Sequence, residues 1–231
     1  MLRFAVIGHP VAHSLSPRIH AANFRALGLD AAYDAVDVAP DDLAAALRRF
    51  AAEGFRGINV TVPHKVAVKE IVDRVDTTAR EAGAVNTVLF EQDGSTTGFN
   101  TDMAGFLHPL KSIGFPFAGA KVLVLGAGGA SRAVVAACRA AGCADVAVAN
   151  RTARPGLVQL GSEECLAAAR AADLVVNATT VGLREGDPSV LGADVFHAGQ
   201  LVYDLIPVAR ETATLAAARA AGALTLETVI V

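Results

Sequence analysis

Short apolar runs alternate with longer amphipathic stretches along almost the whole chain. The runs are bounded by Gly, Pro or charged residues, which is typical of buried strands, while the longer stretches repeat apolar residues at helical spacing. Strands that alternate with helices predict an α/β fold with mainly parallel sheets. The expected strands are 2–7, 32–38, 57–60, 85–90, 96–99, 121–125, 145–149, 174–177, 201–204 and 223–226.

Residues at element ends place the helices and turns. Asp41 and Asp42 suit the positive N-terminal end of a helix, and Pro63 stands where a helix can start. Gln92-Asp93-Gly94 predicts a hairpin between the two strands that flank it. The expected helices are 16–27, 41–52, 102–113, 129–141 and 210–221. Gly114, Pro116 and Gly119 then mark a break, so we expect one α/β domain over 1–101 and a second over 102–231.

Composition excludes several classes of function. The net charge of −3 is scattered, so no basic face for nucleic acid is indicated. Charges or Gly interrupt every apolar stretch, so no membrane span is expected, and the first residues read as a strand rather than an export signal. The three cysteines lack metal-ligand spacing, which predicts buried thiols and no metal site. We expect a cytoplasmic protein.

A glycine-rich turn lies between the expected strand 121–125 and the helix that follows. Gly126, Gly128 and Ser131 occupy the G-x-G-x-x-G/A positions, with Ser in place of the last small residue. Glycines let backbone N–H groups approach a pyrophosphate, which the helix N-terminus then stabilises. The placement indicates a Rossmann-like, doubly wound domain that binds a dinucleotide, although such a turn can also be purely structural.

The residues after the next strand distinguish the two nicotinamide cofactors. An NAD site usually has Asp or Glu there to accept from the ribose hydroxyls. This chain has Asn150, Arg151 and Thr152, with Arg154 close by. A guanidinium offers paired donors to a 2′-phosphate, which a carboxylate would repel. The sequence therefore favours NADP, the alternative being that both arginines are ordinary surface charges.

Three segments of the first domain carry candidate chemistry. Ser14 and Ser16 could bind a polar substrate, although Ser16 before a Pro is also a good helix cap. Lys65 follows a strand end and can transfer a proton, or it is simply a solvated Lys at a helix start. Asn86 and Asp102 lie at strand ends and suit a ligand rich in hydroxyl groups, but Asp102 could instead be an N-cap.

Taken together, these segments resemble the shikimate dehydrogenase family. The match extends more weakly to Tyr203-Asp-Leu205, Pro207 and Thr212. The motifs that carry it, in chain order, are His13-Ser-Leu-Ser-Pro17, Asn59-Val-Thr-Val-Pro-His-Lys65, Gly83-Ala-Val-Asn-Thr87, Gly98-Phe-Asn-Thr-Asp102, Gly126-Ala-Gly-Gly-Ala-Ser-Arg132, Asn150-Arg-Thr152 and Asn177-Ala-Thr-Thr-Val-Gly182.

The resemblance implies NADPH-dependent, reversible reduction of 3-dehydroshikimate to shikimate, a step of aromatic amino acid biosynthesis. Lys65 and Asp102 would be the catalytic pair. The implied substrate ligands are Ser14, Ser16, Thr61, Asn86 and Tyr203, with Asp102 also contacting the substrate. The implied NADP-binding residues are Gly126, Ala127, Gly128, Gly129, Ala130, Asn150, Arg151, Thr152, Arg154 and Thr179.

Two features depart from the family pattern. Arg154-Pro-Gly156 leads almost at once to a possible strand at 157–160, which leaves no room for the family's usual helix. The family also continues into a Gly-Leu-x-Met-Leu segment and helices with a substrate-binding Gln, whereas this sequence ends at Val231. The alternatives are therefore a quinate/shikimate-type dehydrogenase and a shortened relative that binds without turnover. The sequence leaves open whether the protein is a monomer or a homodimer.

Overall fold

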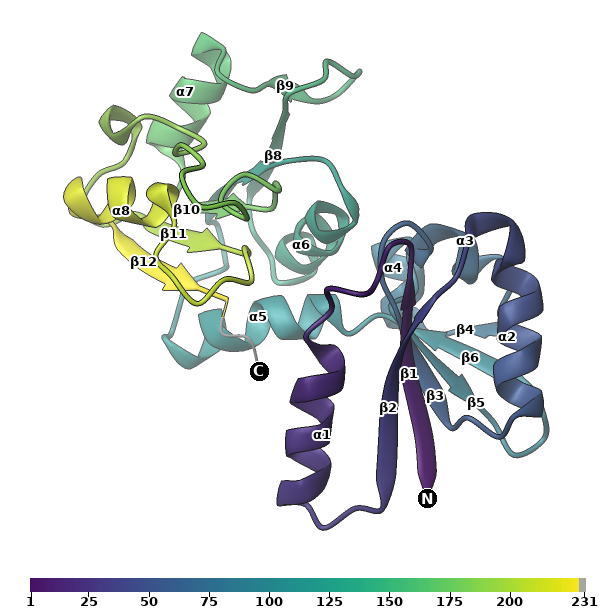
Figure 1. The fold of residues 1–231 in the computed structure, drawn as a ribbon. Helices are drawn as coiled ribbons and strands as arrows, with labels where there is room; N and C mark the ends of the chain where they lie inside the picture. Colours follow the sequence, from purple (N-terminus) through teal and green to yellow (C-terminus); the bar gives the residue numbers. More distant parts are fainter. Residues whose placement is uncertain (229–231) are drawn as a thin grey trace. The chain divides into compact units, whose positions relative to one another are not determined.

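The computed structural model describes residues 1–228 and divides the chain into two units, the first being Met1–Gly105 and the second beginning at Phe106 (Figure 1). Each unit contains a six-stranded sheet, which confirms the predicted α/β class. The division falls within α5 (Asp102–Ser112). No helix within the described residues combines the length and the apolar character needed to cross a bilayer.

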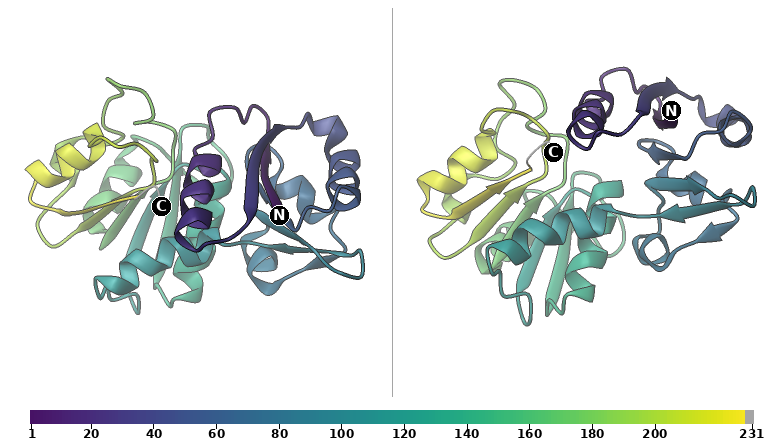
Figure 2. Two further views of the ribbon diagram at one scale, coloured as in Figure 1. Left: turned by 60° about the horizontal axis from the view of Figure 1, so that its bottom comes forward. Right: turned by 90° about the horizontal axis from the view of Figure 1, so that it is seen from below.

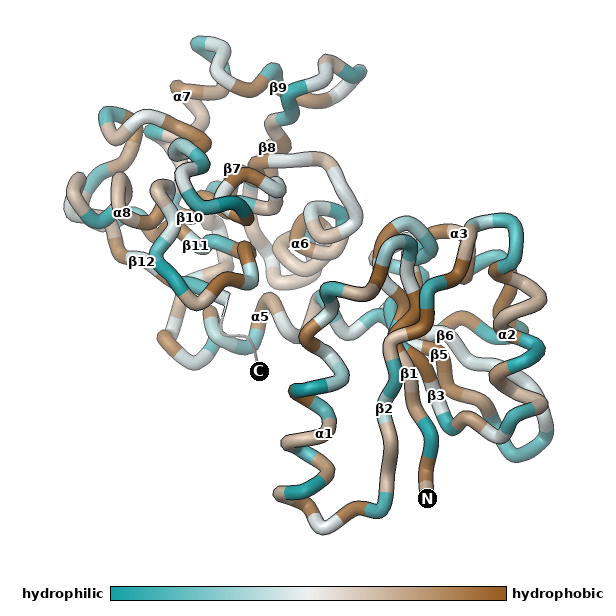
Figure 3. Tube along the Cα trace, viewed as in Figure 1, coloured by the Kyte–Doolittle hydropathy of each residue, from teal (hydrophilic) through white to brown (hydrophobic). Residues whose placement is uncertain are grey.

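The first unit has a mixed sheet in the order β2-β1-β3-β5-β6-β4. β1 pairs parallel with β2 and β3, whereas β5 runs antiparallel to β3 and β6, as the predicted hairpin requires. Hydrophobic residues gather along β1, β3 and β5 (Figure 3). The strands are β1 (Leu2–Gly8), β2 (Ala31–Asp37), β3 (Gly57–Val60), β4 (Arg74–Val75), β5 (Thr87–Phe90) and β6 (Thr96–Phe99).

The two faces of this sheet differ in how well they are packed, and α1 and α2 lie on opposite sides of it (Figure 2). α2 buries Leu43, Leu47 and Phe50 in one apolar cluster with strand residues such as Ile7. Each such side chain contributes about 1.5–3 kcal/mol. Against the other face lies a mostly apolar cavity of about 370 Å³, lined by α1 and by five strands. The helices are α1 (Ser16–Ala26), the 3₁₀ turn η1 (Pro40–Asp42), α2 (Leu43–Ala52), α3 (Lys65–Lys69) and α4 (Thr77–Ala82).

The second unit has an all-parallel sheet in the order β12-β11-β10-β7-β8-β9. Counted from its first strand this order is 3-2-1-4-5-6, that of a doubly wound nucleotide-binding domain. Its strands are β7 (Lys121–Leu125), β8 (Asp145–Asn150), β9 (Val158–Gln159), β10 (Leu174–Asn177), β11 (Leu201–Asp204) and β12 (Leu224–Glu227). Its helices are α6 (Gly129–Ala140), α7 (Glu163–Ala171), the 3₁₀ turn η2 (Ala193–Val195) and α8 (Ala213–Ala220).

β8 and β9 are joined by residues 151–157 alone, without a helix, as the sequence predicts. A parallel connection usually needs a longer crossover because the chain must return to the opposite end of the sheet. Here β9 pairs only with the last two residues of β8, Ala149 with Val158 and Asn150 with Gln159. The chain therefore moves one strand sideways without travelling the length of the sheet.

Three short elements, β4, α4 and α7, and the 3₁₀ turn η2 are missing from the elements expected from the sequence. Both helices have recognisable N-caps: the Asp76 carboxylate accepts from the backbone N–H of Thr78 at 2.9 Å, and the Ser162 hydroxyl accepts from that of Cys165 at 3.2 Å. The helices lack a long amphipathic repeat, so caps were the signal that could have located them. Of the three thiols, Cys138 and Cys165 are buried as predicted, and Cys143 is half-buried.

Candidate active site

Lys65 and Asp102 form an ion pair in the first unit, with 2.7 Å between Lys65 Nζ and Asp102 Oδ2. The two side chains are 20% and 30% exposed, so the pair is partly desolvated yet accessible to a ligand. Lys65 opens α3 just beyond the carboxyl end of β3, and Asp102 opens α5 after β6. Adjacent His64 fixes this turn, because its buried ring contacts the Val38 carbonyl oxygen at 2.7 Å. The Lys65–Asp102 contact is a short charge-assisted hydrogen bond, which is a strong one.

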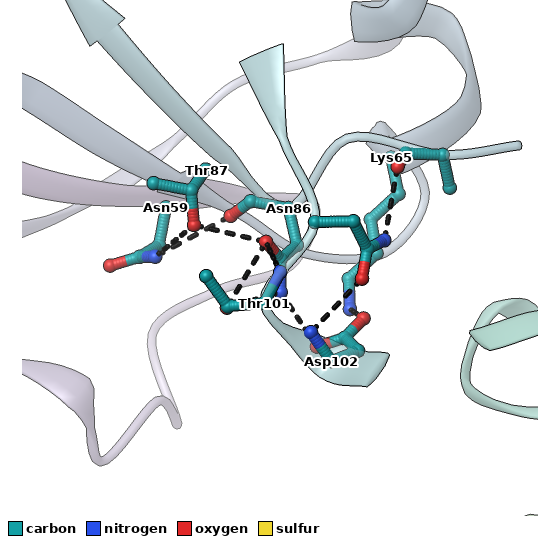
Figure 4. Close-up of polar contacts among 8 residues, drawn as sticks. Asn59, Lys65, Asn86, Thr87, Thr101 and Asp102 are labelled. Atoms are coloured by element: carbon teal, nitrogen blue, oxygen red, sulfur yellow. Dashed lines mark hydrogen bonds and ion pairs between the residues drawn. The ribbon is translucent and has the colours of Figure 1, made fainter. Parts of the chain in front are cut away.

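The second oxygen of Asp102 is held by Asn86 (Figure 4). Asn86 Nδ2 donates to Asp102 Oδ1 at 2.7 Å and to the Thr101 hydroxyl at 3.0 Å. Asn86 Oδ1 accepts from the backbone N–H of Thr101 at 3.0 Å and from the Thr87 hydroxyl at 2.9 Å. The amide therefore has one consistent orientation, with its NH₂ group toward the carboxylate.

The side chain of Asp102 does not act as an N-cap, which was the alternative expected from the sequence. Within the described residues both carboxylate oxygens are bonded by side chains, Lys65 and Asn86, and Asn100 Oδ1 accepts from the Asp102 backbone N–H at 2.9 Å. Buried Asn100 thus takes the role of satisfying the helix start. This leaves the carboxylate of Asp102 facing Lys65.

Ser14 and Ser16 lie together in the loop between β1 and α1. The Ser14 hydroxyl donates to the Ser16 hydroxyl at 3.1 Å and accepts from the Ser16 backbone N–H at 3.3 Å. Ser16 is the first residue of α1 and makes no side-chain cap, contrary to the capping alternative. Asp37 anchors the start of the loop, contacting His9 Nδ1 at 2.6 Å, and this hydrogen bond is the main cause that lowers the pKa of Asp37. Thr61 is half-buried just after β3.

The glycine-rich turn of the second unit has the geometry of an anion cradle. Gly126 has a φ of +101°, and a Cβ there would lie 2.8 Å from the Ala178 carbonyl oxygen, so only Gly fits. Gly128 precedes α6 without a side-chain cap, and a Cβ on it would meet nothing within 4 Å. Gly128, Gly129 and Ala130 are exposed, while Ala127 is half-buried. The first N–H groups of α6 therefore face an open space that suits a pyrophosphate.

The segment after β8 is ordered by backbone contacts and presents two positive charges. Asn150 Nδ2 donates to the Thr152 carbonyl oxygen and Gln159 Nε2 to that of Arg151, both at 2.9 Å. Arg151 and Arg154 are exposed, and neither has an acidic partner among residues 1–228. These guanidinium groups remain available for a phosphate.

Two predicted ligands are already engaged by the protein. The Thr179 hydroxyl donates to Asn177 Oδ1 at 2.7 Å and accepts from the Val181 backbone N–H at 3.0 Å. Tyr203 is buried in β11 and stacks on Phe106 with ring centroids 5.4 Å apart; burial raises its pKa. The roles of Thr179 with cofactor and Tyr203 with substrate stay predictions.

A buried carboxylate to which the motifs assign no role lies at the end of β11. Asp204 is 1% exposed and accepts from Thr212 Oγ1 at 2.5 Å, from Asn177 Nδ2 at 3.0 Å and from the Ile206 backbone N–H at 3.1 Å. Burial raises the pKa of Asp204, although its hydrogen bonds act in the opposite direction. The group fixes the strand ends around β10 and β11.

Comparison with known proteins identifies the family. Residues 6–88 match the model for the shikimate dehydrogenase substrate binding domain. The chain is 45% identical over 234 residues to the NADP(+) shikimate dehydrogenase of Rubrobacter xylanophilus, covering 94% of this chain and 81% of that protein. The chain belongs to the shikimate dehydrogenase family. This confirms the resemblance drawn from the motifs.

Solved structures of shikimate dehydrogenases confirm the fold of this chain. The Thermus thermophilus enzyme in complex with NADP(H) and shikimate matches with a TM-score of 0.86 and 43% identity, over 97% of this chain and 86% of that one. The Aquifex aeolicus enzyme matches with a TM-score of 0.87 and 40% identity, over 98% and 86%. An N-terminal substrate domain followed by a Rossmann-like NADP domain is the arrangement of these shikimate dehydrogenases, as the sequence predicts here.

Proposed function

We propose that this chain catalyses the NADP-dependent, reversible reduction of 3-dehydroshikimate to shikimate. The observation that carries the proposal is the Lys65–Asp102 ion pair, whose carboxylate is fixed on its other side by Asn86. The similarity to NADP(+) shikimate dehydrogenases supports both the reaction and the cofactor. Cytoplasmic location stays a prediction, and the oligomeric state stays open.

The first unit supplies groups for a small acid with several hydroxyl groups. Ser14, Ser16 and Thr61 donate hydrogen bonds to a carboxylate or hydroxyl, and Asn86 and Asp102 contact hydroxyl groups of the ring. Both Ser hydroxyls already bond to each other, so their positions are set before a ligand arrives. Such preorganisation lowers the entropy cost of binding.

The second unit supplies the NADP site. Gly126 to Ala130 would hold the pyrophosphate, where the start of α6 is exposed and a Cβ at Gly128 meets nothing within 4 Å. Arg151 and Arg154 would bind the 2′-phosphate, and Asn150, Thr152 and Thr179 would complete the contacts. When bound, NADPH is the source of the hydride that reduces the ketone carbon.

Lys65 acts on the charge and the proton of the reacting oxygen. As the ketone is reduced its oxygen becomes negative; the Lys65 ammonium stabilises it, and the Lys65–Asp102 pair delivers its proton. Asp102 holds Nζ at 2.7 Å, so the ammonium is oriented in advance. In the reverse direction the same pair accepts the proton. Because Lys65 Nζ and Asp102 Oδ2 share one short hydrogen bond, the transfer is assigned to the pair.

The proposal is tested by NADP⁺-dependent oxidation of shikimate by the purified chain. Turnover should require shikimate and NADP⁺ and should be lost in Lys65→Ala. Quinate in place of shikimate, and NAD⁺ in place of NADP⁺, are the controls. Faster turnover of quinate would instead identify a quinate/shikimate-type enzyme. Absence of turnover by a folded chain that still binds NADPH would contradict the proposal and favour a binding protein.

A further inference from the structure

Tyr33 joins parts of the first unit that are distant in sequence. It lies in β2, and its ring stacks on His20 with centroids 4.2 Å apart and planes 7° apart. Its hydroxyl donates to Asn59 Oδ1 at 2.6 Å. Burial raises the pKa of Tyr33. The phenol thus stays protonated and lies between His20 of α1 and Asn59 of β3.

Asn59 and Thr87 continue this contact toward the candidate active site. Because Asn59 Oδ1 accepts from Tyr33, its Nδ2 group faces the other way and donates to the Thr87 hydroxyl at 3.1 Å. The Thr87 hydroxyl in turn donates to Asn86 Oδ1 at 2.9 Å. β3 and β5 are paired in antiparallel register with Asn59 opposite Thr87, which brings these side chains together (Figure 4).

All donors along this path point toward Asp102. The order runs from Tyr33 through Asn59, Thr87 and Asn86 to the carboxylate, which Lys65 contacts from the other side. We infer that Tyr33, Asn59 and Thr87 form a positioning relay that holds the Asn86 amide against Asp102 and ties it to α1 through the stack of Tyr33 on His20. The effect of the relay on turnover rests on the proposed function, whereas the hydrogen bonds that form the relay do not.

The relay matters because the side-chain amide of Asn86 could rotate by about 180° and exchange the positions of its oxygen and NH₂ group. In that orientation its carbonyl oxygen would point at the Asp102 carboxylate. The repulsion would displace this carboxylate from Lys65. Hydrogen bonds aligned in one direction also polarise each other, so a hydroxyl removed at Thr87 weakens the bond at Asp102. The Thr101 backbone N–H remains on Asn86 Oδ1, so loss of one relay member should weaken the orientation and not abolish it.

The test is the side-chain amide signal of Asn86 in ¹H–¹⁵N NMR spectra of the full chain, assigned by its loss in Asn86→Ala. Thr87→Val and Tyr33→Phe should each move it. Thr97→Val is the matched control, because this hydroxyl on neighbouring β6 donates to Glu91 instead, at 2.8 Å. An unmoved signal in both relay variants, or an equal shift in the control, would overturn the relay.

Kinetics test whether the relay acts on the reaction. With rates expressed per NADPH-binding site, kcat should fall roughly three- to tenfold in Thr87→Val, the range for one neutral hydrogen bond, and recover in Thr87→Ser. In an Asp102→Asn background, Thr87→Val should lower kcat no further. If Thr87 had a merely structural role, the substitution would lower kcat by the same factor in both backgrounds. Equal losses would refute action through Asp102. If wild-type chain does not turn over shikimate, the proposed function fails while the NMR result still decides the relay.

Discussion

The polar site of the first unit and the glycine-rich turn of the second present their binding groups in opposite ways. In the first unit the carboxylate of Asp102 and the amide of Asn86 are bonded to neighbouring side chains within 3.0 Å. In the second, the N–H groups at the start of α6 face open space, and Arg151 is exposed.

The difference reflects what each site has to recognise. A proton-transfer site needs atoms held to a fraction of an ångström, which side chains achieve only when other side chains hold them. A pyrophosphate is bound mainly through charge and backbone donors, which the fold positions without help from side chains. Substitutions should therefore affect turnover in the first unit and binding or folding in the second.

Asp102→Asn should produce the largest effect on turnover. The new amide keeps the volume but presents no negative charge to Lys65, so kcat should fall by roughly 10²–10⁴-fold, the range for a lost acid–base group. NADPH affinity, measured by isothermal titration calorimetry, should stay within about twofold of wild type, because the cofactor groups lie in the other unit. A loss of NADPH binding equal to the loss in kcat would show that the two sites are not functionally separate.

Gly126→Ala should damage folding and cofactor binding together. The added Cβ would meet the Ala178 carbonyl oxygen at a positive φ, so unfolding in urea should be easier by about 1–3 kcal/mol. Gly128→Ala is the matched control: its Cβ meets nothing within 4 Å, so stability should change little while NADPH affinity falls. Equal stability of both variants would contradict the close approach at Gly126.

Removing the two exposed arginines should change the choice between NADP and NAD and nothing else. Arg151→Ala with Arg154→Ala should raise the Kd for NADP⁺ by roughly 10–100-fold, as expected for lost charged hydrogen bonds, and leave that for NAD⁺ nearly unchanged. Exposed Arg139 at the end of α6 provides the control substitution. Similar losses for both cofactors would argue against a 2′-phosphate site here.

Asp204→Asn should give the smallest effect, one that depends on pH. Since the folded-state pKa of Asp204 is raised, its contribution is fully present below the unfolded-state pKa and is lost as pH rises through the folded-state value. The stability advantage of wild type over the variant should therefore shrink as the pH rises above about 4. Urea unfolding across this range measures it, and a growing advantage would contradict the raised pKa.

Elements whose signal is local could be predicted from the sequence, and contacts that depend on strand order could not. The buried runs 57–60, 121–125 and 201–204 match β3, β7 and β11 because apolar residues bounded by turn residues are sufficient evidence. Lys65 and Asp102 are 37 residues apart, and only the family resemblance paired them in advance. Their contact depends on β3, β5 and β6 being adjacent in the sheet.

Tyr33 shows the same limit at a single residue. In the sequence it is one aromatic residue of a strand, with no motif around it. Its hydrogen bond with Asn59 exists because β2 and β3 pair with β1 from either side, in a register that places Tyr33 and Asn59 on the same face of the sheet. Side-chain direction alternates along every strand, so an alternation argument could have placed Tyr33 on a face but not beside a particular partner.

The short connection between β8 and β9 bears on how this chain can evolve. Residues 151–157 contain both exposed arginines and support only the two residue pairs of an edge strand. Under the proposed role of Arg151 and Arg154, cofactor preference is encoded in a segment that can be lengthened, shortened or exchanged at the cost of one marginal strand. A lineage could switch between NADP and NAD here by small insertions, while the other five strands of this sheet and the Lys65–Asp102 pair are inherited unchanged.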